Sequence, residues 1–265
     1  MQFFKRKKKT IGLALSGGGL RGIAHLGVIK ALEEYDLKPS VISGTSAGAI
    51  VGAFYSAGFS PDELIAMVQK ISFFSARSLR FSRSALFDKG MLMKIFMHYM
   101  PENNFSSLKI PLYITATDIV SGRPKYFHQG ELHNALMASA SIPFIFPVAK
   151  MEEHYFLDGG IINNLPIEPI QQKCDVLIGV HVNALSTKDG ATISGRALFD
   201  RVIHLALGQS VYHKSGLCDL FIEPPDMTRF NMFDKKNATT MFNYAYGYTF
   251  KYLAQHQEKI KKLLR

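Results

Sequence analysis

A serine framed by glycines, in Gly44-Thr-Ser46-Ala-Gly48, follows the short run 41–43 and precedes small and apolar residues that continue to Gly58. This is the G-x-S-x-G pattern at a strand-to-helix junction, where a sharp turn exposes the serine hydroxyl at the head of the helix. With glycine near 7% of residues, the pattern arises by chance in roughly one chain of this length in ten. Its significance therefore depends on what the rest of the sequence supplies.

Strand-like and helix-like segments alternate along the chain. Short apolar runs indicate buried strands, whereas helical spacing of apolar residues or a capping box, as in Ser60-Pro-Asp-Glu63, indicates helices. This alternation predicts a three-layer α/β/α sandwich with a mostly parallel central sheet, in which 125–127 is an antiparallel neighbour of 110–118. The expected strands are 10–16, 41–43, 110–118, 125–127, 154–157, 175–183 and 219–222; the expected helices are 23–35, 46–57, one from residue 61, 86–100, 131–139, 197–212 and 239–264, the last interrupted at Gly247. Residues 73–84 are expected to form a loop.

The length of 265 residues suits one large domain, and 47% hydrophobic with 20% charged residues is typical of a globular protein. Cys174 and Cys218 are expected to be reduced thiols, which favours a cytoplasmic protein; a single disulfide is the alternative. The N-terminus imitates a signal peptide, but its apolar run, 11–15, is too short. The uncharged stretch 39–61 is long enough to cross a bilayer, yet it is rich in Gly, Ser and Thr, so no membrane span is predicted.

The net charge of +10 is concentrated at the two ends of the chain, because residues 5–9 are all basic and 251–265 carry five basic residues against one acid. Such termini would suit peripheral contact with an anionic membrane surface. A solubilising tail and a solvated helix face explain the same charges. Nothing in the sequence matches a nucleic-acid-binding motif, so no nucleic-acid partner is expected.

The first glycine cluster fits G-x-G-x-x-G through Gly17, Gly19 and Gly22, which is the dinucleotide-binding fingerprint when it joins a strand to a helix. That site needs an acidic residue at the end of the second strand to hold a ribose. Here the second strand ends in Ser43-Gly-Thr-Ser46, without an acid. The sequence therefore argues against a nucleotide, and neither a cofactor nor a metal is expected.

The same loop is suited to stabilising an oxyanion beside a nucleophile. Consecutive glycines at a helix N-terminus present free backbone N–H groups, which the helix dipole assists. Gly17, Gly18 and Gly19 are the candidate donors, and the amide of Ala47 is a further one. Arg21 either orients this loop or attracts an anionic head group, and simple packing of the loop is the alternative.

A serine nucleophile needs a base. The chain has nine histidines, but none lies in a glycine-marked loop at the end of a strand. Asp158 does, because it follows an apolar strand and precedes Gly159 and Gly160. A turn without catalytic function is the alternative interpretation of this Asp-Gly-Gly segment.

Four motifs in order and spacing resemble the patatin-like phospholipase family across residues 11–172. They are Gly17-Gly-Gly-Leu-Arg-Gly22, Gly44-Thr-Ser-Ala-Gly48, Ala138-Ser-Ala-Ser-Ile-Pro-Phe-Ile-Phe-Pro147 and Asp158-Gly-Gly160, the last followed by Asn163 and Pro166. Val148 stands where many members have a second proline. The resemblance implies a catalytic core at 11–172; a basic tail at 1–10 precedes it, and strands with a long basic helix at 173–265 are expected to complete the same domain.

This resemblance also implies a Ser-Asp dyad, in which Ser46 is the nucleophile and Asp158 the base. Around the dyad and the Gly17–Gly19 oxyanion hole, the supporting residues are Arg21, Gly22, Gly44, Ala47, Gly48, Gly159 and Gly160. The implied activity is hydrolysis of carboxylic esters, of the phospholipase A, lysophospholipase or carboxylesterase type, on fatty acyl esters. Two alternatives remain open, namely a regulatory or membrane-binding module with little turnover and an acyltransferase.

A Ser-Asp dyad needs a suitable environment, because an aspartate with a pKa of ~3.9 is a poor base for an alcohol. Asp158 can serve if the Ser46 hydroxyl is aligned on it and water is excluded. The Met- and Phe-rich segment 86–100 is either an adaptable lining for an apolar ligand or ordinary core packing.

Overall fold

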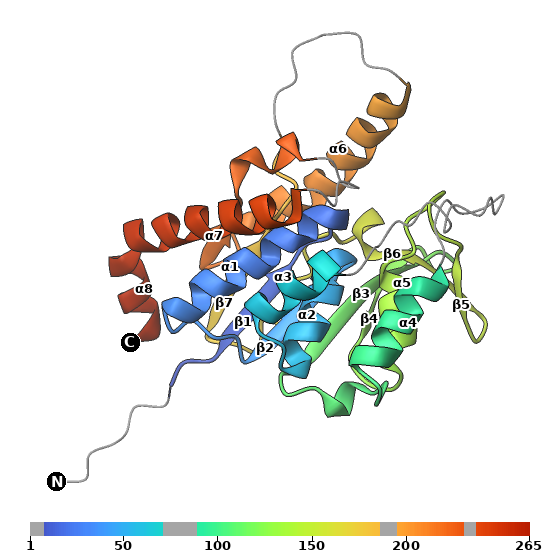
Figure 1. Cartoon of the computed structure of the whole chain (residues 1–265), viewed down its shortest axis with the longest axis horizontal. Helices are drawn as coiled ribbons and strands as arrows, with labels where there is room; N and C mark the ends of the chain where they lie inside the picture. Colours follow the sequence, from blue (N-terminus) through green and yellow to red (C-terminus); the bar gives the residue numbers. More distant parts are fainter. Residues whose placement is uncertain (1–7, 71–88, 186–194, 231–236) are drawn as a thin grey trace.

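A computed structural model describes residues 8–70, 89–185, 195–230 and 237–265, and it shows a central sheet with helices on both faces (Figure 1). Most of the predicted N-terminal tail and the predicted loop 73–84 lie outside the described residues. The strands are β1 (Ile11–Leu15), β2 (Val41–Thr45), β3 (Leu112–Asp118), β4 (Arg123–Phe127), β5 (Ala149–Met151), β6 (His154–Asp158), β7 (Val176–Val180) and β8 (Leu220–Ile222). The helices are α1 (Ile23–Glu34), α2 (Ala47–Ala57), α3 (Pro61–Lys70), α4 (Lys89–Tyr99), α5 (Leu132–Ser139), α6 (Gly195–Ser215), α7 (Ala238–Gln255) and α8 (Gln257–Leu264).

The sheet has the strand order β5-β6-β3-β2-β1-β7-β8, with β4 paired to β3. Its centre is parallel from β3 to β8, whereas β4, β5 and β6 run antiparallel to their neighbours. This confirms the predicted α/β sandwich with a mostly parallel sheet and the predicted antiparallel partner of β3. Strand β5 was not predicted, because its three residues follow a proline-broken segment and are held in place by pairing with β6.

The two faces of the sheet bury different clusters, as the alternation of side chains along β1 shows. Leu13 and Leu15 pack with the apolar faces of α1, α2 and α7 in the larger cluster. Ala14, on the opposite face, packs with Leu165 and with Val211 of α6. Helix α5 lies on the same face as α2, which is the face that carries the candidate site.

The long C-terminal helix differs from the prediction, because it is continuous through Gly247 and breaks at His256 instead. The backbone of His256 leaves the helical region, and its imidazole Nδ1 hydrogen-bonds to the carbonyl oxygen of Tyr252 at 2.8 Å. This side chain therefore caps the end of α7, and α8 starts anew beyond it. Cys174 and Cys218 are both free thiols, as expected. Within the described residues, no helix combines the length and the apolar character needed to cross a membrane.

Two glycine substitutions are expected to change stability in opposite directions. Gly27 lies where α1 crosses α7, and a Cβ there would overlap the carbonyl oxygen of Phe242. We expect Gly27→Ala to lower the free energy of unfolding by about 1–3 kcal/mol, the usual effect of overpacking.

Gly247, inside α7, has open space around it, so Gly247→Ala should raise the free energy of unfolding by about 0.5–1 kcal/mol. Urea unfolding monitored by circular dichroism measures both, and a destabilised Gly247→Ala protein would contradict the continuous helix.

Candidate active site

Ser46 lies in a strained turn between β2 and α2. Its backbone angles are φ 53° and ψ −120°, in a region that non-glycine residues rarely adopt. Its amide donates a 2.8 Å hydrogen bond to Ser139 Oγ, and the Ser139 hydroxyl donates in turn to the carbonyl oxygen of Thr115 at 2.6 Å. The end of α5 and strand β3 therefore hold the turn in its strained conformation, as a G-x-S-x-G elbow requires.

Ser46 and Asp158 are brought together because two strands meet end to end along the same edge of β3. Thr45, at the end of β2, pairs with Thr115, and the next residue of β3, Ala116, pairs with Asp158 at the end of β6. The opposite edge of β3 is taken by β4. The carboxyl ends of β2 and β6 thus converge on one point, although 112 positions separate the two residues in the sequence.

The environment of Asp158 favours a neutral carboxyl group more than water does. Its residue is 8% exposed, and burial raises the pKa of Asp158 from 3.8 to about 6. Hydrogen bonds from the Ser46 side chain and from the Gly160 amide oppose this shift, the second at 2.8 Å to Oδ1. The carboxylate is therefore a stronger base than an exposed aspartate, and it is aimed at the serine.

The backbone amide of Asp158 is also fixed, because it donates to the carbonyl oxygen of Ser141 at 2.9 Å. Thr117 Oγ1 donates to the carbonyl oxygen of Asp158 at 2.9 Å. The position of the carboxylate is thus set by β3 and by the loop that follows α5.

The glycine loop lies against the serine turn, since a Cβ on Gly17 would be 3.3 Å from the Cβ of Ser46. The Gly17 amide donates to Asn164 Oδ1 at 3.0 Å, which differs from its predicted place among the free donors. Within the described chain, the amides of Gly18 and Gly19 have no acceptor, nor does that of Ala47 in the first turn of α2. These three N–H groups are available to an oxyanion.

Arg21 is 3% exposed, and its side chain links the glycine loop to two residues far away in the sequence. Its Nε donates to the carbonyl oxygen of Phe230 at 2.8 Å, and its guanidinium also donates to Asn183 Oδ1 at 3.2 Å. Asn183 Nδ2 in turn donates to the carbonyl oxygen of Gly17 at 2.8 Å. These contacts agree with the interpretation that Arg21 orients the loop, and its burial argues against the attraction of a head group.

The remaining glycines of the predicted site allow close contact between backbone segments. A Cβ on four of them would overlap a neighbouring atom: for Gly22 the Cβ of Ala47, for Gly44 the backbone of Gly48 and Ala49, for Gly48 the carbonyl oxygen of Leu15, and for Gly159 the carbonyl oxygen of Thr115. Gly160 supplies the amide that binds Asp158. All the predicted site residues therefore converge at the carboxyl ends of β1, β2 and β6.

The described histidines bind elsewhere. His25 lies three residues after the glycine loop in the sequence, but its Nε2 hydrogen-bonds to the carbonyl oxygen of Ser16 at 2.8 Å and burial lowers its pKa to about 4. Among histidines whose side chains the structure describes, none hydrogen-bonds to Ser46 or Asp158. The described residues also contain no group of three or more side chains able to hold a metal ion.

Three residues of the site were not predicted, namely Ser139, Asn164 and Asn183. Ser139 belongs to the Ala138–Pro147 motif, and Asn164 follows directly after the motif residue Asn163. The sequence therefore marked the segments that contain Ser139 and Asn164, but it did not indicate which groups their side chains contact. Asn183 carries no local signal, because only the pairing of β7 with β1 brings the end of β7 beside the glycine loop.

The comparisons with known proteins agree with the geometry. The family model described as "Patatin-like phospholipase" matches residues 13–170. Lysophospholipase nte1 of Aspergillus fumigatus is 31% identical over 192 residues, which are 67% of this chain and 12% of that protein. An uncharacterized NTE family protein of Mycobacterium tuberculosis is 32% identical over 179 residues, 65% of this chain and 49% of that protein. This chain therefore spans less than half the length of either relative.

Among solved structures, VipD from Legionella pneumophila is similar with a TM-score of 0.51 and 15% sequence identity. The similarity covers 94% of this chain and 67% of VipD. At this level of identity it concerns the fold alone.

Proposed function

Because the chain belongs to the patatin-like phospholipase family, we propose that it is a lipid acyl hydrolase that cleaves carboxylic esters through an acyl-enzyme on Ser46. The observation that carries the proposal is that Thr45, next to Ser46, and the buried Asp158 pair with consecutive residues of β3, so that the Ser46 side chain hydrogen-bonds to the Asp158 carboxylate. The substrates are fatty acyl esters of glycerophospholipids or lysophospholipids. The names of the relatives support a lipid substrate.

In the proposed first step, Ser46 Oγ attacks the ester carbonyl carbon while its proton passes to the Asp158 carboxylate. The carbonyl oxygen becomes an oxyanion, which accepts hydrogen bonds from the amides of Gly18, Gly19 and Ala47. When the intermediate collapses, the C–O bond to the leaving alcohol breaks and Asp158 returns the proton to that alcohol. Ser46 is then acylated.

In the second step, a water molecule attacks the acyl-enzyme and gives its proton to Asp158. Collapse of the second tetrahedral intermediate breaks the bond to Ser46 Oγ, which regains the proton from Asp158, and releases the fatty acid. The raised pKa of Asp158 suits this role, because a base near the working pH accepts and returns a proton with the smallest mismatch.

Release of free fatty acid from phosphatidylcholine and lysophosphatidylcholine vesicles, resolved by mass spectrometry, tests the function. Wild type is expected to release fatty acid and Ser46→Ala is not. A competing alcohol in the assay separates hydrolysis from acyl transfer, since a transferase would make the new ester instead. Binding to these vesicles with no turnover of any ester would favour a regulatory module and contradict the proposal.

We keep peripheral contact with an anionic membrane surface as part of the proposal. Helix α8 buries Ile260 and exposes Lys259, Lys261 and Lys262. Such a basic face is attracted to anionic lipids over roughly a Debye length of about 10 Å at 0.1 M salt. At low salt, fatty acid release should therefore be faster from vesicles with added phosphatidylglycerol than from vesicles without it. Equal rates from the two kinds of vesicle would contradict the proposed membrane contact.

Asn164 positions the oxyanion loop in this scheme. Its side chain is buried and its Oδ1 accepts the Gly17 amide, which fixes the loop that presents Gly18 and Gly19. We expect Asn164→Ala to lower kcat about 10–100-fold with little change in KM, less than the ~10²–10³ lost with a whole oxyanion donor. Steady-state kinetics on a soluble ester measure both constants.

Asn163→Ala is the matched control, because the Asn163 side chain contacts Tyr126, Glu168 and Lys214, away from the loop. It is expected to reduce stability more than kcat. Equal losses of kcat in the two variants would argue that Asn164 acts only through general destabilisation.

A further inference from the structure

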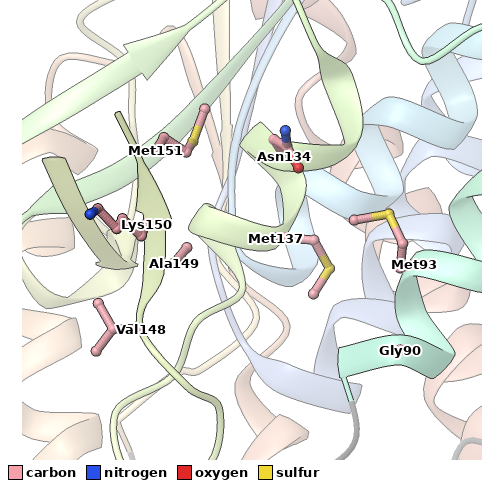
Figure 2. Close-up of a pocket in the computed structure, with 8 residues that line it drawn as sticks. All are labelled: Gly90, Met93, Asn134, Met137, Val148, Ala149, Lys150 and Met151. Carbon is pink, nitrogen blue, oxygen red and sulfur yellow. The ribbon is translucent and has the colours of Figure 1, made fainter. Parts of the chain in front are cut away.

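A pocket of about 350 Å³ lies between α4, α5 and β5 (Figure 2). This volume is within the range of about 300–1,000 Å³ typical of small-ligand pockets. Figure 2 shows the Met93 side chain pointing from α4 toward α5, which carries Met137. The lining residues are Gly90, Met93, Asn134, Met137, Val148, Ala149, Lys150 and Met151.

The pocket lies on the same face of the sheet as the Asp158 side chain. Ala149 pairs with Phe156 and Met151 with His154, and side chains alternate along a strand, so these residues share the face of Asp158. Packing confirms this, because Ala149 and Met151 contact the cluster that contains Phe156. Phe156 and His154 come two and four residues before Asp158 on β6. With a rise of about 3.3 Å per residue, their partners Ala149 and Met151 therefore lie about 7 and 13 Å from Asp158 along the strand direction.

Helix α5 forms a second link between the pocket and the candidate site. Ser139, in its last turn, binds the amide of Ser46. Met137 and Asn134, which lie two and five residues before it on the same helix, line the pocket. The pocket therefore begins beside the elements that hold the dyad and extends away from it, along α5 and β5.

The lining favours an apolar, flexible ligand. It contains three methionines, whose unbranched and polarizable side chains adapt to irregular apolar shapes. The described lining has no carboxylate. Its one cation, Lys150, lies over the ring of Tyr155 at 5.6 Å, and Figure 2 shows its side chain directed away from Met137.

We propose that this pocket binds the distal part of the fatty acyl chain whose carbonyl carbon Ser46 attacks. The inference rests on the proposed function, and it adds a place for the acyl chain and a basis for chain-length preference. Short acyl groups end before the pocket, whereas long ones bury methylenes against Met93, Met137 and Met151. Each methylene buried in an apolar site strengthens binding about fourfold, so the pocket favours long chains.

Filling the pocket tests this assignment. Met93→Trp and Ala149→Phe are expected to lower kcat/KM for the p-nitrophenyl ester of palmitate at least ~10-fold while leaving that of butyrate nearly unchanged. Met97→Trp is the matched control, because Met97 lies one turn further along α4, is 59% exposed and does not line the pocket. Circular dichroism checks that each variant folds. A wild-type chain-length profile in both filled variants, or the same shift in Met97→Trp, would overturn the proposal.

A binding measurement separates this proposal from the proposed hydrolysis. Fluorescent cis-parinaric acid is titrated into Ser46→Ala protein with and without Met93→Trp, and no turnover is needed. We expect the filled pocket to weaken binding at least ~10-fold and the added Met97→Trp to leave it unchanged. If wild type cleaves no ester but this difference is found, hydrolysis fails and the apolar binding site stands; unchanged binding overturns the pocket assignment whatever the activity.

Discussion

Ser46→Ala is expected to fold as wild type does and to lose ester hydrolysis by a factor on the order of 10⁴–10⁶, as removal of a serine nucleophile does in serine hydrolases. The oxyanion loop and the pocket remain in this variant, but no atom is left to form the acyl-enzyme. The measurement is kcat on a soluble ester, together with labelling by a fluorophosphonate that reacts with activated serines. Intact mass should show one adduct on wild type and none on Ser46→Ala.

Ser56→Ala is the matched control for this substitution. Ser56 lies on the same helix, α2, and its hydroxyl is buried without a hydrogen-bond partner in the described chain. This variant should keep both the activity and the adduct. A fluorophosphonate adduct on Ser46→Ala would refute Ser46 as the nucleophile.

The strained backbone at Ser46 can be tested separately from activity, through the stability of two variants. A non-glycine residue held in a sparsely populated backbone region costs on the order of 1–3 kcal/mol, and glycine relieves much of that cost. We therefore expect Ser46→Gly to be inactive but more stable than Ser46→Ala in urea. Equal stability of the two variants would show that the turn is not strained.

Asp158→Asn is expected to lower kcat by about 10²–10⁴, the usual contribution of a general base. The asparagine oxygen can still accept the Gly160 amide, so the fold should be preserved, but it cannot take a proton from Ser46. Asp118→Asn is the control, because Asp118 is also buried and binds the amide of Val120 and the side chains of Ser121 and His154. Asp118→Asn should retain turnover. A fully active Asp158→Asn enzyme would exclude the dyad and return attention to the histidines.

The pH profile of the wild-type enzyme follows from the raised pKa of Asp158. The base must be ionised, so log(kcat/KM) should rise with a slope near 1 below about pH 6 and level off above it. An exposed aspartate would place this inflection near 3.8. A profile that is flat from pH 4.5 to 8 would contradict the burial of the base.

The raised pKa of Asp158 also affects stability: activity rises with pH through this range, whereas stability falls. Because the folded protein binds the proton of Asp158 more tightly than the unfolded chain, this group lowers the free energy of unfolding as the pH rises from 3.8 to about 6. Asp158→Asn removes this dependence. The variant should therefore be at least as stable as wild type at pH 7. The wild-type protein is destabilised at this pH because it keeps a charged carboxylate in a buried site.

Several features of the site could be predicted from the sequence because they are local. A G-x-S-x-G pattern between a β-branched run and a helix defines the turn at Ser46, and Asp158 is marked by its position between an apolar strand and two glycines. The missing acid after the second strand argued against the nucleotide interpretation of the first glycine loop. Short apolar runs were enough to predict most strands, and the alternation of strands with helices was enough to predict the α/β class.

Other features were wrong or missing. The break in the C-terminal helix was expected at Gly247, but α7 continues through that residue and ends at His256, whose side chain hydrogen-bonds to the carbonyl oxygen of Tyr252 one turn earlier. The remaining differences depend on partners far away in the sequence. Strand β5 exists through pairing with β6. The sequence also counted Gly17 as a free donor, although Asn164 occupies its amide.

The sequence by itself determined which residues are the candidates for the chemistry, since the serine turn, the glycine loop and the Asp-Gly-Gly segment are each set by local backbone requirements. Only the tertiary structure decided how they work together. The register of β3 places the ends of β2 and β6 on adjacent residues, and burial at that point shifts the pKa of Asp158 toward neutrality. Register and burial arise from the packing of the whole domain, so no local pattern encodes them.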